Sequence, residues 1–159
     1  MIAAVITISD SAHAGTRPDR SGPAVRARLE ELGWTVAVAE IVPDERAVIA
    51  ARLASLADSG HVGVIFTTGG TGLGPRDVTP EATRDVIERE IPGIPEVMRA
   101  EGRRATPMAA LSRALAGTRG AVLVVNLPGS PRGALESLNA IVGLAPHTVE
   151  LLRGHTEHP

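Results

Sequence analysis

The sequence contains no cysteine and no lysine among its 159 residues. Without cysteine, the chain cannot form disulfide bonds, thiolate metal sites or a cysteine nucleophile. Without lysine, it has neither the phosphate-binding lysine of a Walker-type loop nor a lysine that forms a Schiff base. All 16 basic residues are therefore arginines.

Aromatic residues are almost absent as well, since only Trp34 and Phe66 occur and make up 1% of the chain. Hydrophobic residues make up 43%, so the core must be built from Ala, Val, Leu and Ile. A protein that stacks bases on aromatic rings needs more rings than this. The net charge of -2 gives no electrostatic reason for a nucleic-acid partner either, and we expect none.

The chain also lacks a long hydrophobic run. The apolar stretch Met1–Ile8 has no basic flank and is followed by the acidic Asp10, so it is too short for a signal peptide or a membrane span. We expect a soluble, cytoplasmic protein that does not associate with membranes. The length is that of one domain, which we place at residues 1–154, with a short polar tail at 155–159.

Short apolar runs alternate with helical patterns along the chain. Ile2–Ile8, Val62–Thr67 and Ala121–Leu127 are continuous, which is typical of parallel strands covered on both faces. Thr35–Val42 alternates more and is expected nearer an edge. This order predicts an α/β fold with three layers, a doubly wound, mostly parallel sheet with helices on both faces. Apolar residues recur at helical spacing between the runs at Val25, Leu29 and Leu32, at Ile49, Leu53 and Leu56, and at Leu135, Leu138, Val142 and Ala145.

Two stretches give weaker signals. Thr79–Gly102 predicts two helices that are broken near Pro92–Pro95. Thr106–Gly120 is interrupted by Pro107 and Gly117, and its pattern predicts no particular element.

Residues suited to anion binding follow the predicted strands at their carboxyl ends, where ligands of open parallel sheets bind. The most informative segment is Thr67–Glu81, which reads TTGGTGLGPRDVTPE. Glycines in such a turn let backbone N–H groups approach an anion, and threonine hydroxyls add hydrogen-bond donors. An arginine adds a planar, positively charged guanidinium that can donate two parallel hydrogen bonds. The candidate anion-binding residues of this segment are Thr68, Gly69, Gly70, Thr71, Gly72 and Arg76.

Asp77 lies between this glycine-rich turn and a predicted helix start. Thr79 is predicted to be the N-cap and Pro80 the first helical residue, so that the positive end of the helix faces the site. A carboxylate beside phosphates makes physical sense mainly when a divalent cation bridges them. Mg²⁺, which prefers oxygen ligands, is the natural candidate.

Each of these patterns also has a purely structural interpretation. A glycine-rich loop can be only a tight turn, Asp44 can cap a helix that starts at Glu45, and Ser130–Pro131 can be a plain helix start. Asp19 and Ser21 can likewise be turn and cap residues. The convergence of anion-binding loops and acidic residues at several strand ends favours a functional site, because stability alone does not require it.

The same segments resemble the molybdopterin adenylyltransferases of the MogA/MoaB type, a family that includes the G domains of plant and animal molybdenum-cofactor proteins. The resemblance extends from about Ala4 to Gly154, and its most specific part is GGTG followed by PRDVTPEAT and NLPGSP. The matching stretches are ISDS (Ile8–Ser11), DRSGP (Asp19–Pro23), VPDE (Val42–Glu45), TTGGTG (Thr67–Gly72), PRDVTPEAT (Pro75–Thr83), LSR (Leu111–Arg113), RG (Arg119–Gly120) and NLPGSP (Asn126–Pro131).

The resemblance implies an enzyme that joins AMP from ATP to the terminal phosphate of molybdopterin and releases pyrophosphate, with Mg²⁺ as cofactor. It also implies a homotrimer or hexamer, and a molybdate-insertion protein as the downstream partner. The two active-site aspartates of the family correspond to Asp44 and Asp77, which favours a catalytic and metal-binding role for both. The alternative is a catalytically silent, molybdopterin-binding scaffold of the same family, and the presence of both aspartates argues against it. Further residues expected to contact the pterin or the nucleotide are Ser9, Asp10, Ser11, Pro128, Gly129 and Ser130.

Overall fold

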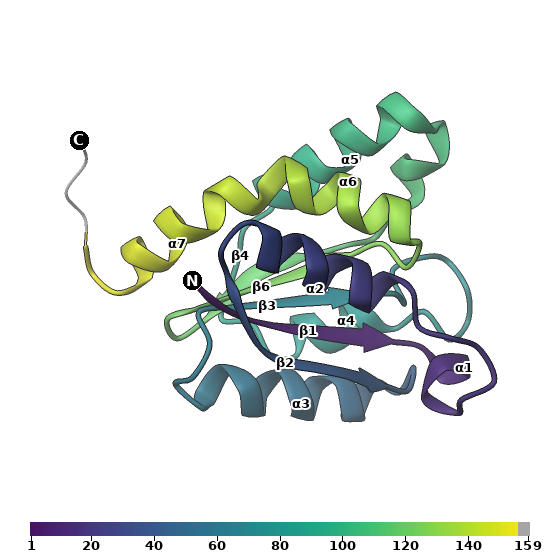
Figure 1. The fold of residues 1–159 in the computed structure, drawn as a ribbon, viewed down its shortest axis with the longest axis horizontal. Coiled ribbons are helices and arrows are strands. Elements are labelled where there is room, and N and C mark those ends of the chain that lie inside the picture. The colour runs from purple at the N-terminus through teal and green to yellow at the C-terminus, as the bar shows by residue number, and fades with distance from the viewer. Residues whose placement is uncertain (156–159) are drawn as a thin grey trace.

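The computed structural model describes residues 1–155 and contains one six-stranded sheet with the strand order β2-β1-β3-β6-β5-β4 (Figure 1). Of the polar tail predicted at 155–159, residues 156–159 lie outside the described part of the chain. The strands are β1 (Ile2–Ile8), β2 (Thr35–Val42), β3 (Val64–Thr68), β4 (Arg89–Glu90), β5 (Ala116–Arg119) and β6 (Val122–Leu127). The helices are α1 (Asp10–His13), α2 (Ser21–Glu31), α3 (Arg46–Asp58), α4 (Thr79–Arg84), α5 (Gly93–Ala105), α6 (Pro131–Ile141) and α7 (Ala145–Leu152), with 3-10 turns η1 (Pro107–Leu111) and η2 (Val142–Leu144).

The four predicted strands are confirmed, and they form the parallel part of the sheet. β1 pairs in parallel with both β2 and β3, and β3 pairs in parallel with β6. The three inner strands are almost completely buried, which explains their continuous apolar sequences, whereas β2 forms an edge and alternates between exposed and partly buried residues.

Two short antiparallel strands at the other edge are not apparent in the sequence. β5 pairs with β6, and β4 pairs with β5, both in antiparallel orientation. β4 lies between α4 and α5, so the break predicted near Pro92 is confirmed but contains a strand. β5 contains Gly117 and only four residues, which is too little for a recognisable periodic pattern.

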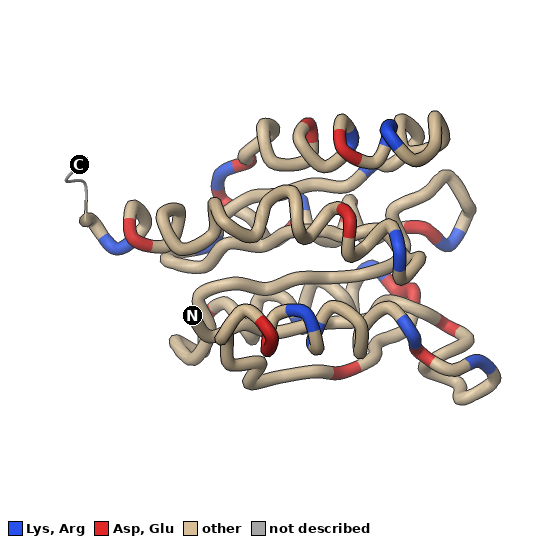
Figure 2. The backbone as a smooth tube through the Cα atoms, turned by 45° about the horizontal axis from the view of Figure 1, so that its top comes forward, with Lys and Arg blue, Asp and Glu red and all other residues tan. Residues whose placement is uncertain are grey.

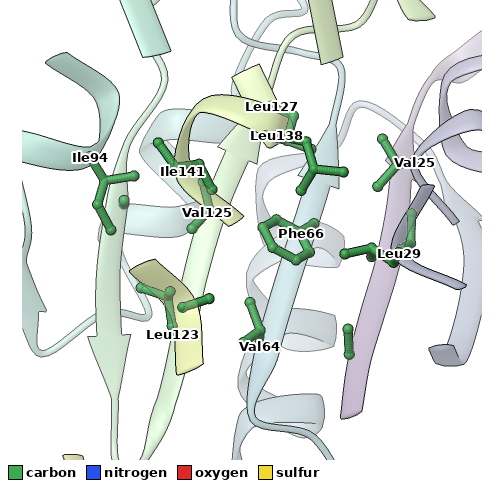
Figure 3. Packing of buried hydrophobic residues seen from close by; sticks show 14 of the residues in the cluster. Val25, Leu29, Val64, Phe66, Ile94, Leu123, Val125, Leu127, Leu138 and Ile141 are labelled. Atoms are coloured by element: carbon green, nitrogen blue, oxygen red, sulfur yellow. The ribbon is translucent and has the colours of Figure 1, made fainter. Parts of the chain in front are cut away.

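Two hydrophobic cores lie on opposite faces of the sheet, which confirms the three-layer architecture. One face is covered by α2, α5, α6 and α7, and the other by α3 and α4. Phe66 is fully buried at the centre of the first core, close to Leu29 and Leu138 (Figure 3). Its ring lies 6.2 Å from that of Trp34, and all other core side chains are aliphatic or methionine, as the composition predicts.

The connections after β1 and β3 leave the sheet toward opposite faces. The chain passes from β1 to α2 on the first face, and from β3 to α4 on the second. The register places Thr7 beside Thr68 and Thr68 beside Leu127, so the ends of β1, β3 and β6 lie level at one edge. This is the topological switch point, where open α/β sheets bind ligands.

In the described residues, no helix is both long and apolar enough to traverse a bilayer.

Candidate active site

A polar cleft of about 460 Å³ lies at this switch point. The carboxyl ends of β1 and β3 form its floor, and segments following β1, β2, β3 and β6 form its walls. Nine of the predicted site residues line it, namely Ser9, Ser11, Asp44, Thr68, Gly69, Gly70, Asp77, Gly129 and Ser130. The structure thus brings together residues that are more than 100 positions apart in the sequence, such as Ser9 and Gly129.

The glycine-rich turn after β3 requires glycine at its first two positions. Gly69 and Gly70 have φ values of 105° and 66°, which side chains rarely tolerate. A Cβ at Gly69 would also overlap the carbonyl oxygen of Ile8, and one at Gly70 would overlap the hydroxyl of Thr79. The turn therefore packs directly against the end of β1, and this contact places its backbone in the floor of the cleft.

Threonine hydroxyls fix this turn in place. Thr68 donates a hydrogen bond to the carbonyl oxygen of Pro128 at 2.7 Å, which ties the turn to the loop after β6. Thr79 donates to the carbonyl oxygen of Gly69 at 2.9 Å. The prediction that Thr79 caps α4 is therefore wrong, because the N-cap is Val78 and no side chain caps the helix.

Asp44 is held by a reciprocal pair of hydrogen bonds with Asp10. The Oδ2 atom of Asp44 accepts from the backbone N–H of Asp10 at 2.8 Å, and Oδ1 of Asp10 accepts from the N–H of Asp44 at 2.9 Å. The following helix α3 has Glu45 as its N-cap without a side-chain bond, so Asp44 does not cap it. Burial raises the pKa of the Asp44 carboxyl, and the negative charges of Asp10 and Asp77 raise it further, against the lowering effect of the Asp10 N–H and of Arg76.

Asp77 is the second carboxylate that lines the cleft. Its Oδ2 atom accepts from the N–H of Gly74 at 2.8 Å, and a side chain at Gly72 or Gly74 would crowd this carboxylate. The negative charge of Asp77 is one of the causes that raise the pKa of Asp44, and two carboxylates in one cleft form a favourable place for a cation. In the described part of the chain no three histidine or acidic side chains cluster as metal ligands. A carboxylate pair nevertheless suits Mg²⁺, which commonly takes its other ligands from substrate phosphates and water.

Asp10 and Arg76 form a bidentate ion pair. The guanidinium of Arg76 donates to both carboxylate oxygens of Asp10, at 2.9 Å and 3.1 Å. This bond is the largest of the effects that lower the pKa of Asp10. The pair lies outside the lining of the cleft, at its rim, with side-chain exposures of 45% for Asp10 and 61% for Arg76. Substrate contacts by these two residues stay a prediction.

A second, mainly apolar pocket of about 290 Å³ adjoins the first. Thr71, Gly72 and Pro128 line this pocket rather than the polar cleft, and Ser130 lines both. Ser130 also caps α6 by accepting a hydrogen bond from the N–H of Gly133, which confirms that Ser130–Pro131 is a helix start. The same residue lines both pockets, so the cap does not exclude a role in the site.

Arg113, in the stretch without a predicted element, holds the loop that carries Asp77. Its side chain donates to the carbonyl oxygens of Gly72 and Asp77, both at 2.7 Å, and forms an ion pair with Glu81. Its backbone N–H donates to the carbonyl oxygen of Thr71 at 2.9 Å. The only signal for Arg113 in the sequence is the LSR match, which did not specify a role.

Asn126 plays a comparable part in the interior. Its amide group donates to the hydroxyls of Thr67 and Thr83 at 3.0 Å and 2.8 Å, and its oxygen accepts from the N–H of Leu115. One buried side chain therefore links β3, β6 and α4 below the cleft. In the sequence, Asn126 stands out only as the first residue of the NLPGSP match, which indicates no role for it.

The fold and the cleft together define a class of protein. It is a doubly wound α/β protein whose topological switch point carries a glycine-rich turn and a pair of carboxylates, an arrangement suited to phosphate-bearing ligands.

Comparison with known proteins defines the family. Residues 4–147 match the family described as probable molybdopterin binding domain, and the chain belongs to this family. It is 40% identical over 153 residues to a Helicobacter pylori protein named molybdopterin adenylyltransferase, with 95% of this chain and 87% of the relative covered. The resemblance described from the sequence motifs is thereby confirmed.

Two further relatives extend this result. The chain is 43% identical over 149 residues, or 93% of its length, to the molybdenum cofactor synthesis protein cinnamon of Drosophila melanogaster, but spans only 25% of that protein. The solved structure of the molybdopterin biosynthesis enzyme MoaB from Thermus thermophilus is similar, with a TM-score of 0.89, 48% identity and 96% of both chains covered.

Proposed function

We propose that this chain is a molybdopterin adenylyltransferase, which transfers AMP from ATP to the terminal phosphate of molybdopterin and releases pyrophosphate. The observation that carries the proposal is the pair Asp44 and Asp77, which face one cleft beside the Gly69–Gly70 turn. The names of the Helicobacter pylori relative and of an Escherichia coli relative, 36% identical over 164 residues, support the same reaction.

The chemistry requires two polyanions to meet, so neutralisation and positioning are the main tasks of the protein. Asp44 and Asp77 are the residues that would hold Mg²⁺. When bound, this ion supplies positive charge to the triphosphate and polarises the phosphate under attack. The backbone of Gly69 and Gly70, fixed by Thr68 and its bond to the loop after β6, orients phosphate oxygens in the floor of the cleft.

No side chain needs to act as a general base in this reaction. The attacking group is a phosphate monoester, which is largely ionised at neutral pH because its second pKa lies near 6. Asp44 and Asp77 are therefore assigned to charge neutralisation rather than to proton transfer. The raised pKa of Asp44 fits this role, because a bound cation would stabilise a carboxylate whose negative charge is disfavoured by burial and by the charges of Asp10 and Asp77.

The proposal extends to the assembly and the pathway. We expect a cytoplasmic homotrimer or hexamer whose adenylylated product passes to a molybdate-insertion protein. The competing function is a silent, molybdopterin-binding scaffold, which would have no need for two carboxylates that repel each other inside a phosphate-binding cleft.

The test is pyrophosphate release from ATP by the purified protein, with and without molybdopterin and with and without Mg²⁺. The proposal predicts release only when all components are present, together with an adenylylated pterin product. Binding of molybdopterin without any release of pyrophosphate would establish the scaffold instead.

A further inference from the structure

Two arginines line the polar cleft without an acidic partner in the described part of the chain. Arg17 and Arg20 lie in the exposed segment between α1 and α2, and both line the cleft. Neither guanidinium makes a hydrogen bond or an ion pair with any of residues 1–155. Arg20 belongs to the DRSGP match in the sequence, but neither arginine is among the predicted site residues. Unpaired cations in a cleft are available to a ligand.

Arg76, another arginine near the cleft, is already engaged. Its Nε and Nη2 atoms both donate hydrogen bonds to Asp10 at the rim, and Arg76 does not line the cleft. Of the arginines in the described residues, those that line the cleft are therefore Arg17 and Arg20.

The carboxylate nearest to them in the sequence is also satisfied elsewhere. Asp19 lies between Arg17 and Arg20, but its Oδ2 atom accepts from the hydroxyl of Thr7 at 2.6 Å and its Oδ1 atom from the N–H of Gly22 at 3.1 Å. These bonds direct the carboxylate toward β1 and the start of α2. Asp19 thus shapes the loop that presents the two arginines and leaves their charge uncompensated.

The charges of the cleft are divided between its two sides. Arg17 and Arg20 precede α2, which packs on the same face of the sheet as α6. Asp44 and Asp77 precede α3 and α4, which cover the opposite face. Charged segments of both signs gather at this end of the molecule, on the right in Figure 2. A Mg²⁺ ion held by the acidic side would leave the other side to bind an anion by itself.

We infer that Arg17 and Arg20 bind a phosphate group of one of the two substrates, on the side of the cleft opposite Asp44 and Asp77. This inference rests on the proposed function and deepens it. An adenylyl transfer brings the triphosphate of ATP and the phosphate of the pterin into one cleft. A metal ion held by the two carboxylates would neutralise only part of the negative charge of these phosphates. Guanidinium groups donate paired hydrogen bonds that match phosphate oxygens, so Arg17 and Arg20 are suited to bind the phosphate group that the metal ion does not neutralise.

The direct test measures binding of inorganic pyrophosphate by calorimetry, without Mg²⁺ and without pterin. Arg17→Ala and Arg20→Ala should each weaken binding about tenfold, the usual scale for one charge-assisted contact, and Arg20→Lys should restore part of the loss. Arg153→Ala is the matched control, because Arg153 is exposed, has no ion-pair partner in the described chain, and follows α7 at the opposite end of the strands. Equal affinities in all variants would overturn the inference.

Steady-state kinetics then identify the phosphate. A raised KM for ATP with an unchanged KM for molybdopterin in Arg17→Ala or Arg20→Ala assigns the arginines to the triphosphate, and the reverse assigns them to the pterin phosphate. Unchanged KM values for both substrates would contradict the inference. If the wild-type protein binds pyrophosphate through these arginines but forms no adenylylated pterin, the proposed function fails and the anion site stands.

Discussion

Replacement of Asp44 by asparagine should make the protein more stable and less active at once. Asparagine keeps a side-chain oxygen that can accept the hydrogen bond from the N–H of Asp10, so the local structure is retained. It removes the negative charge that Asp10 and Asp77 repel. Because Asp44 is only partly buried, the gain in the free energy of unfolding should be a few tenths of a kcal/mol at pH 7, roughly the range for exposed charge pairs.

The effect on catalysis should be much larger. Loss of one preorganised electrostatic group typically costs about 10²- to 10³-fold in turnover, and Asp44 is one of two such groups in the cleft. The assay is pyrophosphate release per folded molecule in the presence of saturating Mg-ATP and molybdopterin. Glu45→Gln is the matched control, since Glu45 is an exposed neighbour that makes no side-chain cap bond and does not line the cleft.

The dependence on pH provides an internal check of the same variant. A carboxyl whose folded pKa is raised binds its proton more tightly in the folded than in the unfolded protein, so its ionisation destabilises the fold as the pH rises through the folded pKa. The stability advantage of Asp44→Asn should therefore be present at pH 7 and disappear below the ordinary pKa of aspartate, about 3.9. Denaturant unfolding of the wild type and of Asp44→Asn at several pH values measures this difference in the free energy of unfolding. A variant that is less stable than wild type and fully active would show instead that Asp44 is a structural residue.

Four further predictions concern other parts of the molecule. Asp77→Asn should keep the fold, seen by circular dichroism, and lower turnover by about 10²- to 10³-fold; normal turnover would remove Asp77 from the site. Arg113→Lys should lower kcat by roughly tenfold or more, because one ammonium cannot reach the oxygens of two carbonyls and of Glu81 together, and wild-type kcat would exclude a positioning role. Phe66→Ala should cost about 3–5 kcal/mol in the free energy of unfolding because the ring is fully buried, and a loss below 1 kcal/mol would contradict this packing. The lowered pKa of Asp10 implies that its contribution to stability is present above the ordinary aspartate pKa and lost as the pH falls through the folded pKa, so Arg76→Ala should flatten that part of the stability profile.

The parallel part of the fold was predictable because burial on both faces leaves a plain signal. Strands such as β1 and β6 consist of continuous apolar residues, since helices cover both faces of the sheet. β4 and β5 have two and four residues and are held mainly by pairing with neighbours, so no local pattern reveals them. Thr79 was misassigned as a cap for a related reason, because a tertiary contact with the glycine turn uses its hydroxyl.

The candidate site was predictable where position along the strands determined it. Asp44 follows β2, and Gly69 and Asp77 follow β3; parallel topology brings the ends of such strands to one edge of the sheet. The sequence could not show that Arg76 pairs with Asp10, because that choice depends on the distance between two loops. Arg20 belongs to the DRSGP match, but the sequence indicates no role for it or for Arg17, since their availability depends on where Asp19 directs its oxygens.

A crystal structure of the protein with Mg²⁺ and a non-hydrolysable ATP analogue tests the central claim most directly. We expect a metal ion between the carboxylates of Asp44 and Asp77, with the triphosphate against the Gly69–Gly70 turn. A nucleotide bound outside this cleft, or bound within it without any metal near the two aspartates, would exclude the proposed site.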